Sequence, residues 1–397
     1  MNVSAGLVAK RLIPRVDPDG LAAAFMLSFL ATAGFFYVNI MGAIVSGLVD
    51  GLHLSAAEAG RIGACNVYGA AMGAFCAVLI VGRIPWRRAA VLLLLALIGL
   101  DLGSTGAHSA QLLTVLRLLH GMVGGLLVGI SYAVIARTRS PDRCFGALMV
   151  VQSSLGGLGL MFLPQWVQPF GASVLFVSLA AFSLVALALL PFLPDYDPPV
   201  AAVVRPSSAW SGGLIIALTA VFFFQAGNMA LSAYIIELGR AYGLGLKFVA
   251  ITVGASGWVA TLGALLVVAS AGRWPRILPI AVGSVVALLG NAAFHWSGWP
   301  MVYLVANVVS AITWFFVIPY LLGLCATFDR TGRSASLAGL FSKLGLASGP
   351  YAASLILSHD TSYTTVINLA VGALALATLC GVAAALYRPV VHRCRTT

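Results

Sequence analysis

The stretch GAFCAVLIVGRIPWR at residues 73–87 returns in altered form as GALLVVASAGRWPR at residues 263–276. In both copies a glycine opens an apolar run, and a second glycine begins a short basic turn that contains a proline and a tryptophan. The opening glycines, Gly73 and Gly263, are 190 residues apart. A repeat with this period predicts that the chain contains two related halves.

A second match supports the repeat. The sequence TAGFFY at residues 32–37 corresponds to TAVFFF at residues 219–224, at an offset of 187, and Asp50 then matches Glu237. Between the halves, residues 193–210 are rich in proline and carry two aspartates, which is typical of an extended linker. We therefore predict an N-terminal half over residues 1–192, a cytoplasmic linker over 193–210 and a C-terminal half over 211–397.

The composition determines the class of protein. Of the 397 residues, 61% are hydrophobic and only 8% are charged, against about 25% charged residues in an average soluble domain. This excludes a soluble enzyme and a nucleic-acid-binding module. A transmembrane helix needs roughly 20 apolar residues, and twelve apolar runs of about this length are present. They cover residues 21–47, 58–81, 88–105, 111–136, 145–163, 171–192, 211–236, 248–271, 277–296, 301–326, 335–357 and 362–387. We predict an all-α integral membrane protein with twelve spans in two pseudo-symmetric bundles.

Basic residues orient the spans, because cytoplasmic loops of membrane proteins are enriched in Lys and Arg. With the N-terminus inside, the inner segments hold 17 of the 22 Lys and Arg residues, and the outer loops hold only Arg240 and Lys247. Both termini are therefore expected in the cytoplasm. The inner set is Lys10, Arg11, Arg15, Arg83, Arg87, Arg88, Arg137, Arg139, Arg143, Arg205, Arg273, Arg276, Arg330, Arg333, Arg388, Arg393 and Arg395.

Two local motifs resemble those of a known family. Span four opens with LRLLHGMVGG at residues 116–125, which is similar to the Arg-x-x-x-Gly-x-x-x-Gly stretch of the major facilitator superfamily. The loop VGRIPWRR at residues 81–88 keeps the basic residues of that family's loop between spans two and three but lacks its aspartate. Together with the two six-helix halves, the chain resembles a transporter of this family. The resemblance implies a monomer with gating loops at Gly82, Arg83, Arg87, Arg88, Arg273 and Arg276.

The resemblance also implies alternating access to a solute site near the membrane midplane, between the halves. A charge within a span costs at least about 2.5–3.5 kcal/mol, so such residues usually face water or a partner. Arg117 in span four and Asp101 in span three lie at similar depths, and His120 follows Arg117 by nearly one helical turn. Two interpretations are open: a proton-responsive group in which Asp101 or His120 takes the proton, or a structural ion pair.

Lys343 is the deepest basic residue, about eight residues into span eleven, and that span carries no acid. Its counterpart in the first half is Gln152 or Ser153. A lone ammonium in a cavity attracts an anion, so we expect Lys343 to bind anions; the alternatives are an ion pair or a side chain that snorkels to the interface.

Uncharged polar residues mark the same central zone and are expected to contact solute or to bond neighbouring helices. They are Tyr37, Asn39, Gln152, Gln225, Asn228, Asn307 and Trp314. Asn307 is at the position that matches Arg117, and Arg117 is itself expected to contact the solute. Asp50 and Glu237 end spans one and seven on the outer side, where they are candidates for a gate, and Glu237 is also a candidate for proton coupling.

These residues favour a secondary transporter of a small organic anion coupled to protons. Arg117 and Lys343 lie within spans, whereas no acid lies in the middle of any span, which argues against cationic solutes. Efflux of drugs or metabolites by proton antiport is the alternative. A polytopic enzyme is a distant one, since the chain has no clustered catalytic carboxylates or histidines, no phosphate-binding loop and no CxxC pair. We expect no metal or cofactor, and the Ala, Leu, Gly and Arg-rich composition favours a bacterial inner membrane.

Overall fold

The computed structural model describes residues 14–81, 83–196, 212–270, 273–328, 333–360 and 362–387. Within these ranges the chain is helical and contains no strand. The first half comprises α1 (Leu21–Ala33), α2 (Phe36–Asn39), α3 (Met41–Leu52), α4 (Ala56–Ile80), α5 (Trp86–Thr105), α6 (Ala110–Ile135), α7 (Pro141–Phe170), α8 (Ser173–Leu189) and η1 (Leu190–Phe192). The second comprises α9 (Gly212–Ser232), α10 (Ile235–Ala241), α11 (Leu246–Val259), α12 (Thr261–Ser270), α13 (Ile277–Ala292), η2 (Ala293–Trp296), α14 (Pro300–Ala326), α15 (Arg333–Leu357) and α16 (Tyr363–Leu386).

Eleven stretches of helix in the described part are long and apolar enough to cross a membrane, which confirms the all-helical membrane fold. The twelfth predicted span, the first in the chain, is covered by α1, α2 and α3 together. It is broken at Gly34 and again at Ile40. The sequence did not predict these breaks. At Gly34 a side chain would lie 2.3 Å from the carbonyl oxygen of Gly124, so glycine is what allows the end of α1 to lie directly against α6.

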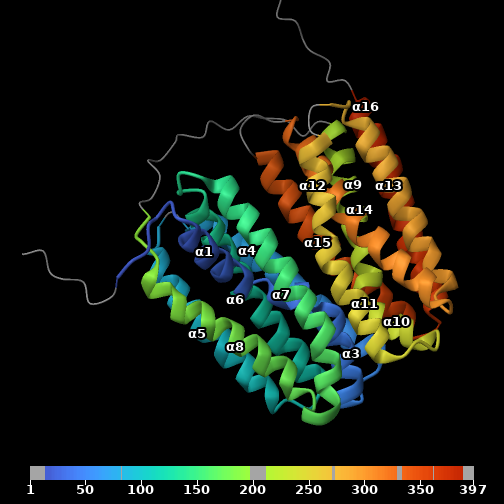
Figure 1. The fold of residues 1–397 in the computed structure, drawn as a ribbon, viewed down its shortest axis with the longest axis horizontal. Coiled ribbons are helices and arrows are strands. Elements are labelled where there is room, and N and C mark those ends of the chain that lie inside the picture. The colour runs from blue at the N-terminus through green and yellow to red at the C-terminus, as the bar shows by residue number, and fades with distance from the viewer. Residues whose placement is uncertain are drawn as a thin grey trace, which may run out of the picture.

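The helices form two bundles, which Figure 1 shows side by side, α1–α8 in blue to green and α9–α16 in yellow to red. Between the bundles, α4 packs along α15 and α7 packs along α11. The repeat seen in the sequence is also present in the packing. A Cβ on Gly73 would lie 1.9 Å from the carbonyl oxygen of Met122, and one on Gly263 would lie 2.1 Å from that of Ile312, which is 190 residues after Met122. The exact domain boundaries stay a prediction, because residues 197–211 lie outside the described part.

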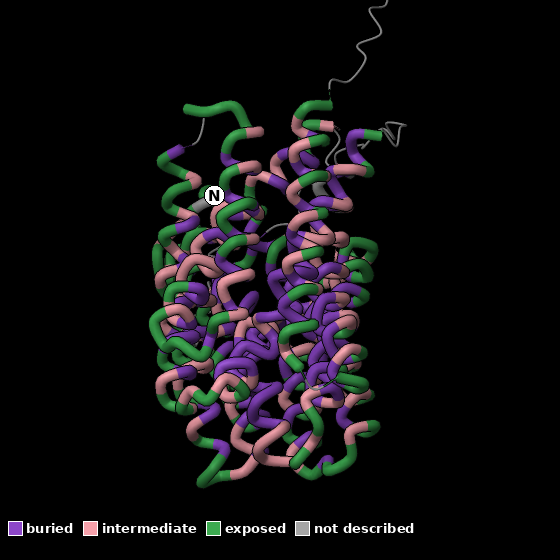
Figure 2. The backbone as a smooth tube through the Cα atoms, turned by 90° about the vertical axis from the view of Figure 1, so that its right-hand side faces the viewer, coloured by how far each residue is buried: buried purple, intermediate pink, exposed green. Residues whose placement is uncertain are grey.

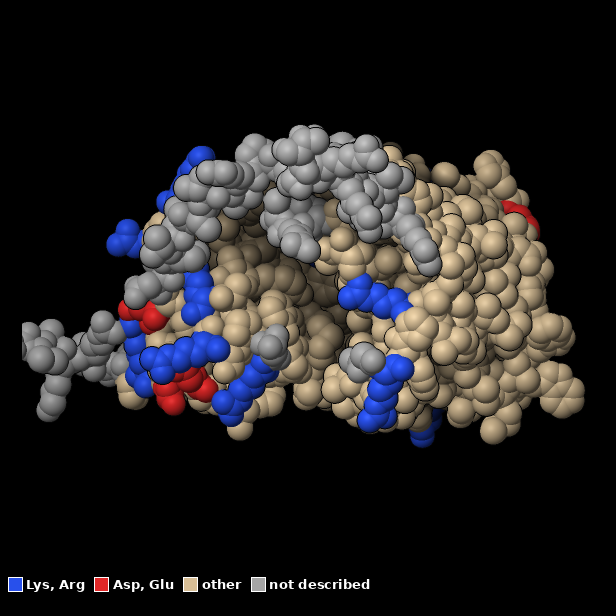
Figure 3. Space-filling model, turned by 90° about the horizontal axis from the view of Figure 1, so that it is seen from above, with Lys and Arg blue, Asp and Glu red and all other residues tan. Residues whose placement is uncertain are grey.

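The apolar surface of the protein is suited to a lipid bilayer. Large apolar side chains such as Val78, Val268 and Leu379 are 77–69% exposed on the flanks, and Figure 2 shows buried residues along the inside of the bundles. Contiguous apolar surface of this kind is rare in soluble proteins. The described arginines of the predicted inner loops gather at one end, seen from above in Figure 3. We call this the basic end and the opposite one the far end.

Candidate functional site

A hollow lies between the two bundles at the basic end. Figure 3 shows it as a depression flanked by basic side chains of both halves. Toward the far end, contacts between the halves close it. The Tyr68 hydroxyl of α4 lies 2.9 Å from Ser348 Oγ of α15, and the indole N–H of Trp258 donates to the Ser154 carbonyl at 3.1 Å. The described part of the molecule is therefore open at the basic end and sealed beyond its middle.

A charged cluster completes the seal at the far end, and it joins the two halves. Arg240 Nη1 of α10 lies 2.8 and 2.9 Å from the two carboxylate oxygens of Asp50 in α3. The same Nη1 lies 3.0 Å from Glu237 Oε1, which also accepts a 2.7 Å hydrogen bond from Ser46 Oγ of α3. We call these four residues the far-end cluster. It holds two carboxylates against one guanidinium.

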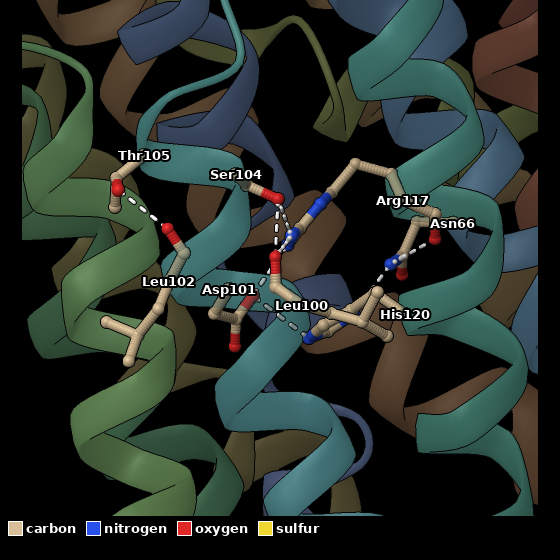
Figure 4. Close-up of polar contacts among 8 residues, drawn as sticks. All are labelled: Asn66, Leu100, Asp101, Leu102, Ser104, Thr105, Arg117 and His120. Carbon is tan, nitrogen blue, oxygen red and sulfur yellow. Dashed lines mark hydrogen bonds and ion pairs between the residues drawn. The ribbon is translucent and has the colours of Figure 1, made fainter.

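A second charged cluster lies inside the first half, among α4, α5 and α6 (Figure 4). Arg117 and Asp101 are fully buried, and Arg117 Nη1 donates to Asp101 Oδ1 at 2.7 Å. Arg117 Nη2 also bonds to the Leu100 carbonyl at 3.1 Å and to Ser104 Oγ. The guanidinium lies 4.9 Å from the centroid of the Phe176 ring. The sequence-predicted pair of Arg117 and Asp101 is thus present, within one bundle rather than at the hollow.

Hydrogen bonds to Asn66 fix the tautomer of His120 in this cluster. Asn66 Nδ2 donates to the Arg117 carbonyl at 3.0 Å and lies 2.9 Å from His120 Nδ1. Turning the amide round would place its oxygen against that carbonyl, so Nδ1 must accept the hydrogen bond. The ring proton of His120 therefore lies on Nε2, 3.3 Å from Asp101 Oδ1. The pair balances one charge of each sign, and Asp101 Oδ2 and Arg117 Nε are buried without a hydrogen-bond partner in the described part. The balanced charge supports the structural interpretation of Arg117 and Asp101.

Lys343 occupies a different environment. It lies on α15, and its Nζ is 5.0 Å from the centroid of the Phe35 ring, at the break between α1 and α2 in the other half. Among the described residues Lys343 has no ion pair and no hydrogen bond. A cation over an aromatic face is attracted by the ring quadrupole, but the ring supplies no negative charge.

Three side chains of the second half, one of them Ser342, the residue before Lys343, form a chain of hydrogen bonds. The Trp314 indole N–H donates to Gln225 Oε1 at 2.6 Å, and Gln225 Nε2 donates to Ser342 Oγ at 2.7 Å. Both polar ends of Gln225 are therefore engaged within the bundle. Trp314 and Gln225, both predicted to contact solute, are brought together by these bonds.

The other predicted polar residues divide into two groups. Tyr37 points into the first half, with its ring 5.9 Å from that of His120, while Asn228 and Asn307 bond to carbonyls of their own helices, at 2.9 and 2.8 Å. Asn39, in contrast, has a buried Nδ2 without a partner among the described residues. Gln152 lies one turn before Gly156 on α7, and Gly156 approaches Asn39 closely.

Of the predicted gating loops, Gly82 lies outside the described residues. Arg87 donates to the carbonyls of Leu190 and Leu193, each at 2.6 Å, and so holds the end of span six in its own half. Arg87 also contacts Asp195, and the hydrogen bond from Arg15 holds the pKa of that carboxyl below its usual range. The remaining loop arginines, Arg83, Arg88, Arg273 and Arg276, have no ion-pair partner in the described part.

Sequence reasoning did not single out several residues that complete these sites. Phe35 was part of the repeated stretch but was not expected to contact Lys343, and Arg240 was counted only as an outer charge. The offset of 187 that pairs Asp50 with Glu237 was the available signal for the far-end cluster. For Ser342, the available signal was its position directly before Lys343 in span eleven.

Comparisons with known proteins agree with this architecture. The family model described as Major Facilitator Superfamily matches residues 22–350. The solved structure of nucleoside transporter NupG superposes with a TM-score of 0.72 at 13% identity, covering 93% of this chain and 100% of that one. A D-xylose-proton symporter gives 0.67 at 16% identity, covering 91% and 96%. A bacterial homolog of the human lysosomal transporter Spinster, in an inward-facing and unoccupied conformation, gives 0.63 at 15%, covering 91% and 94%. No curated protein sequence matches the chain.

Proposed function

Because this chain belongs to the Major Facilitator Superfamily, we propose that it is a secondary active transporter that moves a small organic anion by alternating access. The observation that supports an anionic solute is the environment of Lys343, a cation at the interface between the halves that has no acidic partner in the described part. Burying an uncompensated charge is costly, and a bound anion would remove that cost. Asn39 is one turn from Phe35, the residue that faces Lys343, and Gln225 bonds to Ser342, the residue before Lys343; these links support a shared solute site.

The proposed orientation follows from the basic end. We place it at the cytoplasmic face of a bacterial inner membrane, because basic loops are retained on that side. Both ends of the described chain lie at the basic end: the Val16 N–H bonds to the Phe192 carbonyl, and Tyr387 packs against Phe328. In this orientation the hollow opens inward and the protein functions as a monomer, exchanging solute and protons across the lipid bilayer.

A ligand screen tests the solute class. Carboxylates, phosphates, neutral compounds and cationic drugs are added to the purified protein at pH 5.5 and 7.5, and the unfolding midpoint is measured. A ligand at 100 times its dissociation constant should stabilise the protein by about 2.7 kcal/mol. We expect anions to raise the midpoint of the wild type and of Lys247→Gln, whose lysine lies in the first turn of α11 at the far end, but not of Lys343→Gln. Stabilisation only by cationic or neutral compounds would favour drug efflux instead.

The proton is best accommodated at Glu237. Of the three candidates for coupling, Asp101 and His120 lie inside one bundle, whereas Glu237 belongs to a cluster that links the halves. Two carboxylates share Arg240 there, so the cluster carries an excess negative charge. Neutralising Glu237 would weaken the charge-assisted hydrogen bond that it accepts from Ser46 of α3, which is one of the links between the halves, and so ease their separation at the far end. Protonation there would then be coupled to the change between the two open states.

Glu237→Gln tests the coupling. In proteoliposomes, we expect the rate of solute uptake driven by a proton gradient to fall at least tenfold in this variant. Exchange of labelled for unlabelled solute should continue, because exchange needs no net proton movement. Asp360→Asn is the matched control, since Asp360 is an exposed acid in the loop that joins α15 to α16. If Glu237→Gln retains full proton-driven uptake, the coupling proton must bind to another group, and Asp101 is the first candidate.

A further inference from the structure

The surroundings of Lys343 narrow the class of solute. We infer that the hollow binds an organic anion with a single negative charge and a flat apolar body, held between Lys343 of α15 and Asn39 of α2, with the body against the Phe35 ring. This rests on the proposed function, and it adds the number of charges, the shape of the solute and the two residues that bridge it.

Asn39 supplies the second contact. Its backbone N–H bonds to the Phe35 carbonyl at 3.4 Å, so the two residues are one turn apart and their side chains share a face. The Phe35 ring lies beneath the Lys343 ammonium, which brings Asn39 within about one turn of that charge. Asn39 Nδ2 is buried without a hydrogen-bond partner in the described part. A buried amide N–H left unpaired is costly, and an oxygen of the solute would satisfy it.

The number of unpaired cations within the spans limits the solute to a single negative charge. Among the other buried or half-buried cations of the described part, Arg117 is paired with Asp101, and Arg240 with Asp50 and Glu237. Arg87 contacts Asp195 at the start of α5. Arg137 has no ion pair in the described part, but it lies just after the end of α6 at the basic end rather than within a span. Arg61 is exposed near the start of α4, at the far end. Lys343 can therefore balance one negative charge, and a second would be left without a partner in a medium of low polarity.

The side chains proposed to surround the solute are apolar and aromatic. Phe35 presents its ring to the ammonium, and Trp314 has its single polar group, the indole N–H, already bonded to Gln225. Gln225 is in turn held by Ser342, the residue before Lys343. Trp314 and Gln225 are therefore positioning residues, and what Trp314 offers to a solute is an apolar face. A flat hydrocarbon or aromatic group packs well on an aromatic face of this kind.

The solute would also connect the halves. Lys343 belongs to the second bundle, and Asn39 and Phe35 belong to the first. An anion bound to both contacts would replace the cation–π contact between Lys343 and Phe35 by a stronger charge-assisted bond. Occupancy would then link α2 to α15 through the bound anion at the point where span one is broken, and so favour states in which these two helices stay together.

Matched ligands test this inference on the purified full-length protein. The set comprises aromatic and aliphatic monocarboxylates such as benzoate, their neutral amides such as benzamide, dicarboxylates such as phthalate, and acetate as a charge without a body. Dissociation constants come from the dependence of the unfolding midpoint on ligand concentration. We expect at least one aromatic or long-chain monocarboxylate to bind tenfold or more tightly than its amide, its dicarboxylate and acetate.

Variants assign the contacts. Lys343→Gln should abolish monocarboxylate binding, Lys343→Arg should retain it, and Asn39→Leu and Phe35→Leu should each weaken it about tenfold, while Lys247→Gln leaves it unchanged. The unfolding midpoint without ligand shows whether each variant is folded. If Lys343→Gln does not fold, the binding of ligands to Lys343→Arg is measured in its place. Tighter binding of dicarboxylates, lost in Lys343→Gln, would overturn the single charge and leave the proposed anion transporter standing. Binding of amides alone, or of no member of the set, would overturn this inference, and binding of cationic drugs alone would overturn both.

Discussion

Replacing Asp101 by Asn should lower the free energy of unfolding by about 3–5 kcal/mol, because it leaves the Arg117 guanidinium charged and unpaired inside the first bundle. Both side chains are fully buried, and Asp101 Oδ1 accepts the 2.7 Å bond from Arg117 Nη1. Arg117→Asn should cost as much, since it leaves the carboxylate without its cation. The measurement is the unfolding midpoint of each variant against the wild type in one detergent.

The internal repeat supplies the matched control. At the offset of 190 residues the second half has Asn291 in place of Asp101 and Asn307 in place of Arg117. Each of these amides donates at 2.8 Å to a carbonyl four residues earlier in its own helix. The double variant Asp101→Asn/Arg117→Asn should therefore regain at least half of the loss of either single variant, because it removes both charges together.

The outcome also decides between the two interpretations of the pair. A structural ion pair predicts large single losses and recovery in the double variant. Single variants as stable as the wild type, with proton-driven uptake lost in Asp101→Asn, would instead make Asp101 the proton-responsive group. The hydrogen bonds of His120 already oppose His120 as the group that takes the proton, since Asn66 Nδ2 donates to its Nδ1 and the ring proton already lies on Nε2.

How far the sequence predicts this molecule depends on the kind of signal. The helical spans follow from apolar runs, because a bilayer requires every backbone polar group to be bonded within its own segment. The pairing of Arg117 with Asp101 follows from depth and helical spacing, since both lie on consecutive spans. These signals are local in the chain, and the structure agrees with each of them.

Contacts between the halves left no such local signal. The approach of Phe35 to Lys343 joins residues more than 300 positions apart and depends on the break in span one, which no proline marks. The break follows instead from tertiary packing, because Gly34 lies against Gly124 of α6. Whether a polar residue within a span faces a solute or another helix is likewise set by neighbours: Asn39 is left unpaired, whereas Asn307 bonds to its own helix.

Gly73→Ala and Gly263→Ala should each lower the free energy of unfolding by roughly 1–3 kcal/mol or more, as expected when atoms are forced into a packed interface. The added methyl group would lie 1.9 Å from the Met122 carbonyl oxygen in one half and 2.1 Å from that of Ile312 in the other. Neither oxygen can move without its helix, so α4 must separate from α6, and α12 from α14. The readout is again the unfolding midpoint.

Gly103→Ala and Gly323→Ala are the controls, one in each half, because nothing lies within 4 Å of the added methyl group at either position. Alanine is the better helix former by about 0.5–1 kcal/mol, so these two variants should be as stable as the wild type or slightly more so. Similar losses at Gly73 and Gly263 would show that the repeat preserves the energetics of helix packing as well as its geometry. If both variants match their controls, the close approach of the helices is relieved at little cost, and the two glycines then reflect the duplication of the sequence rather than a requirement of the fold.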